Sequence, residues 1–368
     1  MSNTTAIQII SPGLLTTVQD DGRYAYQRFG MSISGVMDQF SSHVANFLVG
    51  NAPVEAVLET TLMGPSMEMQ GDCVIAVTGA DMAPQINGKP VPMWQTLPVS
   101  KGMVLSFAAL ASGARSYIAF AGGIDLPEVM GSRSTYAKAK VGGLEGRPLR
   151  AGDVLRVNRL QKSLDLKRIR VPEQHIPKYP AQQVLRVVLG PQDDYFTKEG
   201  IDTLCTAQYT VSKECDRMGY RLEGVPIAHK ESADIISDGI MIGSVQVPGN
   251  GLPIILMADR QTTGGYTKVA TVISTDLPKV AQAKAGDRFR FQVVSVEESQ
   301  QILVEQAKRM QALQTSCIPV VEAPAQQAVT APQPAAPART AAPAMGRVIH
   351  QSLTIDGVNF QVELREIL

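Results

Sequence analysis

Short runs of apolar residues, separated by turn residues, dominate the chain. The runs are rich in Val, Ile, Phe and Tyr and are bounded by Gly, Pro, Asn or Asp, which is the pattern of β-strands. They predict strands at residues 7–10, 73–77, 103–107, 116–121, 154–157, 184–190, 240–247, 253–258 and 288–294. The pattern therefore predicts a mostly β protein built from packed sheets or barrels.

Only two segments have the period of a helix. Asp38 can cap a helix over residues 39–49, whose apolar side chains fall on one face. Ser295 and Glu298 form a capping-box pattern that opens a helix over residues 296–313. Helices should therefore be few beside the strands.

An internal echo suggests that the β-rich part is duplicated. "DLPEV" at Asp125 is followed by "AGDVLRV" at Ala151, and "DLPKV" at Asp276 is followed by "AGDRFRF" at Ala285. Each pair predicts a turn and then a Gly-Asp turn that leads into an alternating strand. Ala-Gly-Asp before a strand is common, so chance similarity is the alternative. The ordered repetition of two motifs favours a duplicated β domain.

Changes in composition divide the chain further. A basic, proline-containing segment without period separates the two halves, and the last fifty residues begin with a tract of almost only Ala, Pro, Gln, Val and Thr. Such a tract is typical of an extended, mobile linker. After it, a turn at Asp356-Gly357 between two alternating runs predicts a hairpin, which we expect to dock on the body or on a partner chain. The predicted parts are a first β domain at 1–165, a second at 180–315, the linker at 319–345 and the hairpin at 346–368.

Composition and charge narrow the classes of partner. The 368 residues include 34 Lys+Arg and 34 Asp+Glu without a basic block, which argues against nucleic acid or a membrane surface as the main partner. No signal peptide or transmembrane run is visible, so we expect a cytoplasmic protein. The four cysteines and four histidines are scattered without metal-ligand spacing, so no metal site is predicted.

Four stretches are too polar and too rich in glycine for ordinary turns. They are "QDDGR" at 19–23, "GSRSTY" at 131–136, "DRMGYRLEG" at 216–224 and "ADRQTTGGY" at 258–266. Each contains an Arg, whose planar fork suits a carboxylate or carbonyl group. Backbone N–H groups beside glycines can stabilise an oxyanion, and an Asp or a Tyr with a shifted pKa can move a proton.

The structural alternative is that Asp-Arg pairs only tie loops together. This alternative is weakest for "ADRQTTGGY", because five polar residues at the end of a buried strand carry a heavy desolvation cost without a ligand or a network. The chain has no GxxxxGK[ST] loop, no GxGxxG turn and no GxSxG elbow. From the residues alone, the chemistry of the polar site stays open.

Taken together, these stretches resemble a known family. The chain is similar to the second subunit of allophanate hydrolase-type proteins, the KipA or PxpC family, which includes the carboxyltransferase domain of urea carboxylase and the C subunit of 5-oxoprolinase. The resemblance runs from about Gly13 to Phe291 and is carried by "GLLTTVQDDGRYAYQRFGMSISGVMDQF", "NFLVGN", "LETTLMGP", "VTGAD", "YIAFAGGIDLPEVMGSRSTY", "GGLEGRPLRAGD", "DRMGYRLEG" and "GSVQVPGNGLPIILMADRQTTGGY".

The resemblance implies a fold and partners. It implies two cyclophilin-like β-barrel domains in tandem and a partner of the KipI or PxpB type. The first reading is an enzyme subunit of the 5-oxoprolinase type that is inactive alone. In oxoprolinase relatives the pair joins a LamB/YcsF-type (PxpA) subunit and opens 5-oxoproline to glutamate with ATP hydrolysis. In carboxyltransferase relatives the pair moves CO2 from carboxybiotin on a carrier to a urea-like nitrogen. A regulatory protein that binds a KipI-type partner without chemistry is the third reading.

Carried onto this chain, the resemblance places "ADRQTTGGY" in the pocket for a small amide substrate. We assign Asp259 or Tyr266 to proton transfer and Arg260 to the substrate carbonyl or carboxylate. The residues predicted to bind substrate are Gln261, Thr262, Thr263, Gly264, Gly265, Asn87, Asp38, Arg23, Asp20 and Arg217. No Met-Lys-Met biotinylation site is present, so the chain is not itself a biotin carrier.

Overall fold

The computed structural model describes residues 4–158, 167–320, 348–355 and 358–365. Residues Met1–Val320 group into one compact unit and Val321–Leu368 into a second. Both halves of the predicted duplication therefore lie in one unit, and the boundaries near 165 and 180 stay a prediction.

The first half of this unit consists of two antiparallel sheets. The six-stranded sheet has the order β11 (Val154–Asn158), β1 (Thr4–Ser11), β4 (Ser66–Met69), β9 (Val104–Phe107), β6 (Pro84–Ile86) and β7 (Lys89–Pro90). The five-stranded sheet has the order β2 (Leu15–Gln19), β3 (Val57–Thr61), β10 (Ser112–Phe120), β5 (Cys73–Asp81) and β8 (Leu97–Val99).

The five-stranded sheet is buried on both faces. One face packs against the six-stranded sheet through residues such as Ile75 and Phe120. The other face packs against α1 (Gln39–Leu48) through residues such as Ala76 and Tyr117. Burial on both faces explains why β5 is an almost continuous apolar run rather than an alternating one.

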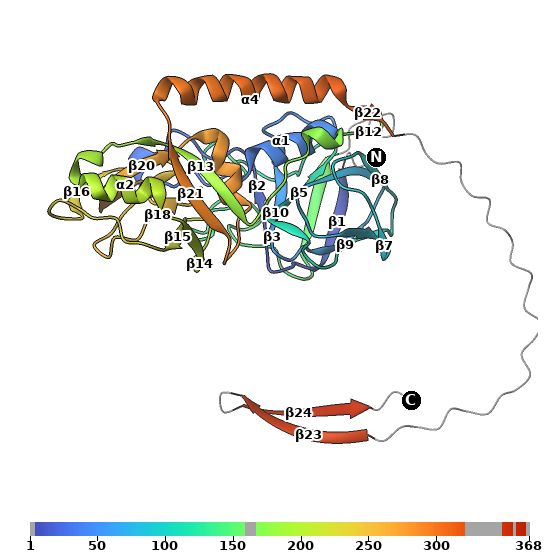
Figure 1. Cartoon of the computed structure of the whole chain (residues 1–368). Coiled ribbons are helices and arrows are strands. Elements are labelled where there is room, and N and C mark those ends of the chain that lie inside the picture. Colours follow the sequence, from blue (N-terminus) through green and yellow to red (C-terminus); the bar gives the residue numbers. More distant parts are fainter. Residues whose placement is uncertain (1–3, 159–166, 321–347, 356–357, 366–368) are drawn as a thin grey trace, which may run out of the picture. The chain divides into compact units, whose positions relative to one another are not determined.

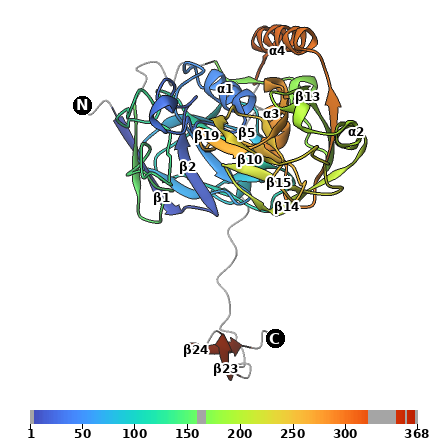
Figure 2. The same cartoon turned by 90° about the vertical axis from the view of Figure 1, so that its left-hand side faces the viewer.

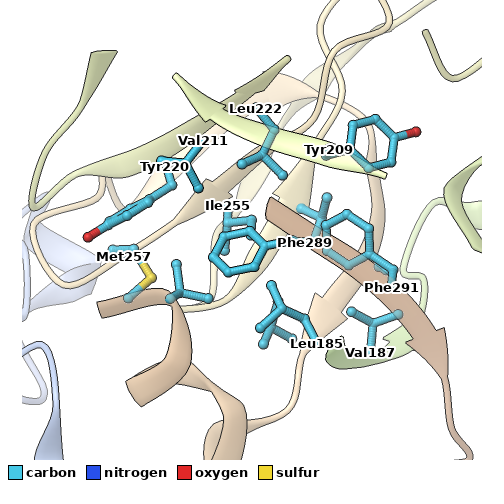
Figure 3. Packing of buried hydrophobic residues seen from close by; sticks show 14 of the residues in the cluster. Leu185, Val187, Tyr209, Val211, Tyr220, Leu222, Ile255, Met257, Phe289 and Phe291 are labelled. Atoms are coloured by element: carbon cyan, nitrogen blue, oxygen red, sulfur yellow. The ribbon is translucent and has the colours of Figure 1, made fainter. Parts of the chain in front are cut away.

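The second half contains a closed seven-stranded barrel. Its order is β13 (Gln182–Leu189), β20 (Lys268–Val272), β17 (Ser244–Gln246), β18 (Ile254–Leu256), β15 (Gly219–Glu223), β14 (Tyr209–Cys215) and β21 (Arg288–Val293). Aromatic and branched side chains such as Phe289, Tyr220 and Ile255 fill the interior (Figure 3). The mostly β fold is confirmed, with a barrel in the second half and two facing sheets in the first.

A two-stranded ribbon stands apart from the barrel sheet. It pairs β16 (Asp234–Gly239) with β19 (Thr263–Tyr266). Ile236 on β16 is almost fully exposed. The ribbon contains most of the "QTTGGY" part of the fourth polar stretch.

The two predicted helices form, as α1 and as α4 (Val296–Ser316), and their predicted caps Asp38 and Ser295 each accept a backbone N–H. Two further helices, α2 (Lys198–Thr206) and α3 (Leu277–Ala281), were not predicted. The short 3-10 turns are Gln27–Phe29, Glu173–His175, Asp193–Tyr195 and Ser274–Asp276. No helix in the described residues is long and apolar enough to cross a membrane.

The two Gly-Asp turns of the internal echo have the same local structure. Gly152 N donates to Ile9 O and Gly286 N to Val211 O, and both glycines have φ near 90°. Asp153 and Asp287 each accept the backbone N–H three residues before them. The preceding "DLPKV" was predicted as a turn, but it belongs to α3, whereas "DLPEV" has no helix.

Helix α4 links the two halves. It follows β21 of the barrel and is followed by β22 (Ile318–Pro319), which pairs with β12 (Ile169–Arg170) beside the first half (Figure 1). Figure 2 shows α4 nearly end-on. Its Leu313 is buried in the cluster that α1 forms with the five-stranded sheet. The helix therefore contributes to holding the halves together.

In the second unit, β23 (Val348–Ile355) pairs antiparallel with β24 (Val358–Arg365), as predicted for a hairpin. The turn residues 356–357 lie outside the described residues, as does the predicted linker beyond Val320. The docking of the hairpin stays a prediction.

Candidate active site

The polar end of β18 lies against the loop that follows "QDDGR". Ser34 N donates to Ala258 O over 3.1 Å, and the Ser32 hydroxyl donates to the same oxygen over 3.2 Å. Asp259 and Arg260 follow Ala258 directly. The fourth polar stretch therefore meets the loop after the first one at the boundary between the two halves.

Arg217, from the third stretch, holds Asp259 from the side. Its Nε and Nη2 donate to the two carboxylate oxygens over 3.0 and 3.1 Å, and Nη1 pairs with Glu59 of β3. Burial disfavours the charge of Arg217, but Asp259 and Glu59 outweigh that effect and raise its pKa. Asp259 is 9% exposed. It is therefore a fixed carboxylate that solvent can still reach.

Glu59 extends this network into the first half. Its Oε2 accepts the Tyr117 hydroxyl at 2.9 Å and Met37 N at 2.7 Å. Burial and the nearby Glu59 raise the pKa of Tyr117 well above its usual value, so the phenol stays a donor. Arg115 Nε lies 3.9 Å from the other oxygen of Glu59.

Asp38 and Gln282 form the next part of the network. Asp38 accepts Ser41 N and the Ser41 hydroxyl at the start of α1, and Gln282 Nε2 donates to it over 2.8 Å. Gln282 Oε1 accepts the N–H groups of Ala114 and Arg115, each at 3.0 Å. Burial raises the pKa of Asp38, and these hydrogen bonds offset it in part. The described contacts give Asp38 a capping and bridging role, and its substrate contact stays a prediction.

Arg260 differs from Arg217 because no carboxylate pairs with it among the described residues. Its Nε and Nη1 donate to the carbonyls of Ile240 and Met257 over 3.2 and 3.3 Å. The side chain is only 6% exposed, and burial lowers its pKa to about 10. A buried guanidinium without a counter-ion has a high affinity for an anion or a polarised carbonyl.

Asp20 ties the first polar stretch to the second. Its Oδ1 accepts Gly22 N and the hydroxyls of Ser132 and Ser134, and its Oδ2 accepts Arg133 N at 2.6 Å. Four donors, three of them on Oδ1, hold this carboxylate in place. Its observed contacts are therefore structural, and its predicted contact with substrate has no support in them.

Arg23 is fully buried beside the hydrogen bonds of Asp20. Its Nη2 donates to Ser134 O over 2.6 Å, and Nη1 has no hydrogen-bond partner among the described residues. Burial lowers its pKa, against the opposing fields of Asp20 and Asp259. Tyr136, at the end of "GSRSTY", also feels the charge of Asp259, which together with burial raises its pKa. Arg217 of the third stretch therefore binds Asp259, while Arg23 and Tyr136 of the first and second stretches feel its charge.

The rest of "ADRQTTGGY" turns away along the ribbon. Gln261 and Thr263 are exposed, Thr262, Gly264 and Gly265 are half-buried, and Tyr266 on β19 is 43% exposed opposite Asp234. No described contact joins the Tyr266 hydroxyl to Asp259. Of the two candidates for proton transfer, Asp259 and not Tyr266 belongs to the buried network with Arg217 and Glu59.

Asn87 was predicted as a substrate contact and lies elsewhere. It forms the turn between β6 and β7, with φ of 51°, and both its N–H and its Oδ1 bond to Val104 of β9. These contacts give Asn87 a structural role in the hairpin turn at the edge of the six-stranded sheet.

Four members of the network were not predicted from the sequence: Glu59, Arg115, Tyr117 and Gln282. The detectable signal was a charged residue inside the apolar strand "VLETT" and a Tyr inside "SYIAFA". Within the described residues, no group of three His, Cys, Asp or Glu side chains could hold a metal ion.

Comparison with known proteins identifies the family. A family model described as "Carboxyltransferase domain, subdomain A and B" matches residues 29–293, which is more than half of the chain. The chain belongs to this carboxyltransferase-domain family. The predicted resemblance is thereby confirmed.

Named relatives of this carboxyltransferase-domain chain fall into two groups. It is 37% identical over 293 residues to the C subunit of 5-oxoprolinase from Escherichia coli, covering 80% of this chain and 93% of that protein. It is 34% identical to "Urea amidolyase" of Saccharomyces cerevisiae, of which it covers 17%. The solved urea amidolyase of K. lactis superposes with a TM-score of 0.80 at 30% identity, over 85% of this chain and 20% of that one.

Proposed function

We propose that this chain is a subunit of an assembly that opens 5-oxoproline to glutamate. The overall reaction consumes the lactam, two waters and ATP and yields glutamate, ADP and phosphate. The relatives named as the C subunit of 5-oxoprolinase, which this chain matches over nearly their whole length, support this reading over that of a free-standing enzyme. The other subunits would be of the KipI/PxpB and LamB/YcsF types.

The observation that carries the proposal is the buried, uncompensated Arg260 next to the fixed Asp259. Arg260 would bind the carboxylate or the carbonyl of the substrate through its unpaired charge. Asp259 keeps lone pairs free on both oxygens after binding Arg217, so it can accept a proton from the substrate or from water. The lactam itself carries one carboxylate near neutral pH, which suits a charged guanidinium.

The test is ATP hydrolysis with and without 5-oxoproline, first with this chain alone and then with its partner subunits. We expect substrate-dependent turnover only in the mixture. Arg260→Gln should lower kcat/KM by about 10- to 150-fold, since a charge-assisted contact contributes about 1.5–3 kcal/mol. Arg221→Gln, which changes an exposed arginine of β15, is the matched control. An assembled complex that ignores 5-oxoproline would refute the proposal.

A pH profile tests the role of Arg260 separately. Burial lowers the pKa of Arg260 to about 10, so its charge is complete well below that pH and is lost as pH rises through it. Substrate affinity should therefore fall above about pH 10 in the parent protein. The profile of Arg260→Gln should lack this alkaline loss.

A second reading is CO2 transfer from carboxybiotin to a urea-like nitrogen. The description of the matching family model and the superposition on urea amidolyase favour it. The same purified chain, supplied with carboxybiotin and urea-like acceptors, would distinguish the two reactions.

A further inference from the structure

A cavity of about 930 Å³ lies away from the Asp259 cluster, where the two halves meet beneath α4. Its walls come from the start of α1, the segment 173–179, β13, α3 and α4. Neither Asp259 nor Arg260 lines it. The volume falls within the range of about 300–1,000 Å³ that is typical of sites for small molecules and cofactors.

Positive side chains reach the cavity from four separate elements. Arg186 of β13 and Lys279 of α3 both pair with the buried Asp276, over 2.6 and 2.9 Å, so this triad keeps one net positive charge. Lys178 and Arg309 add two exposed cations from the connecting segment and from α4.

Two exposed carboxylates, Glu173 and Glu305, line the same cavity. The buried Asp38 also lines the cavity, so the positive and negative groups balance, which disfavours a bare polyanion. A magnesium-bound polyphosphate meets both kinds of group. The metal keeps several waters and takes one or two carboxylates, while the phosphate oxygens take the guanidinium and ammonium groups.

The remaining wall is apolar. Phe40, Ile176, Pro177 and Ile302 offer a surface on which a flat base can pack. Thr275 contributes a buried hydroxyl without a hydrogen-bond partner among the described residues. A ligand with an aromatic base, hydroxyls and phosphates would use every part of this lining.

We propose that this cavity binds a magnesium-nucleoside triphosphate. The inference rests in part on the proposed function, which requires ATP without assigning it a site. It does not need a glycine-rich phosphate loop, because the cations converge from four elements instead.

A chain of buried contacts connects this cavity with the candidate active site. Asp38 lines the cavity, and its backbone N–H donates to the Tyr117 hydroxyl. Tyr117 donates to Glu59, and Arg217 joins Glu59 to Asp259. A nucleotide that displaces Asp38 would therefore act on the same network that positions Asp259.

Equilibrium dialysis with labelled ATP and Mg²⁺ tests the site, using the full chain alone and in its assembly. Arg309→Ala and Lys178→Ala should each raise the Kd about 10-fold or more. Lys308→Ala, the neighbour of Arg309 on α4, does not line the cavity and should leave the Kd within about twofold. Adenosine and tripolyphosphate, each alone, should compete weakly, because each uses only part of the lining.

The proposal is overturned if neither the chain nor the assembly binds MgATP, or if Arg309→Ala and Lys308→Ala bind it equally. Its failure can be told apart from that of the proposed function. An active oxoprolinase assembly that Arg309→Ala leaves unchanged would reject only the cavity. Saturable MgATP binding that depends on Arg309, without a response to 5-oxoproline, would reject only the proposed reaction.

Discussion

Replacement of Arg217 by Met tests whether the buried network holds the two halves together. Arg217 comes from the barrel half and neutralises Glu59 of the first half and Asp259 of its own half. Methionine preserves much of the side-chain length but removes the charge and all its donors. Asp259 would then have no guanidinium partner among the described residues, Glu59 would keep only Arg115 at 3.9 Å, and the Gly35 carbonyl would lose a donor at 2.6 Å.

The expected cost is large. Removal of one partner from a buried ion pair destabilises proteins by about 3–5 kcal/mol, because the other charge stays buried. For domains of about 150–250 residues, 1 kcal/mol shifts the Tm by about 2–4 °C, so we expect a fall of about 6–20 °C. Adding Asp259→Asn should restore part of this loss, since it removes the carboxylate that pairs with Arg217 and not with Arg115.

Circular-dichroism melts of the purified chain give the measurement. The matched control is Arg221→Met on β15, whose side chain is 56% exposed and pairs with the still more exposed Glu214 over 3.4 Å. Exposed pairs of this kind contribute about 0–1 kcal/mol. Equal Tm values for the Arg217 and Arg221 variants would refute the assignment of Arg217 as the link between the halves.

Three further predictions concern stability. Burial alone would raise the pKa of Asp276, but hydrogen bonds from Arg186 and Lys279 hold this pKa below the usual 3.8. The ionised Asp276 therefore stabilises the folded chain above that pH, and this contribution is lost as pH falls further. Melts of Asp276→Asn between about pH 6 and 3 should show a lower Tm at the upper end and a shallower acid dependence. Gln282→Leu strands two backbone N–H groups and should cost about 2–4 kcal/mol in urea unfolding. Gly142 and Gly131 both have positive φ, so replacement by Ala strains the backbone at both positions. The new Cβ of Gly142→Ala would also clash with Ser134 O, whereas that of Gly131→Ala meets nothing within 4 Å, so Gly142→Ala should have a Tm several degrees lower than Gly131→Ala.

The elements that follow a local pattern were predictable from the sequence. The nine apolar runs, the two capped helices and the Gly-Asp turns depend on neighbouring residues, whereas β3, β14 and β20 were not predicted. Helix α2 was missed because Gly200 interrupts a mostly polar segment, although Thr197 caps it. Helix α3 has only five residues, too few to show a period.

The residues of the candidate site were predicted from the sequence, but most of the contacts between them were not. Polar stretches at strand ends identified Asp259, Arg260 and Arg217. Their partners depend on contacts across more than a hundred residues, such as Glu59 with Arg217, which no local pattern encodes. The ribbon could not be predicted from the sequence for the same reason, because part of the barrel separates β16 from β19 along the chain.

The buried polar partners lie in different halves, which has a consequence for the evolution of the chain. Glu59 and Asp38 lie in the first half, while Arg217 and Gln282 lie in the second. A gene cut near residue 170 would give two fragments, each with polar groups that only the other fragment can satisfy. Such fragments should be unstable when made apart and should regain structure when made together. If the two halves arose by duplication, this complementarity now makes either copy unusable alone, so the chain can be split but not shortened to one half.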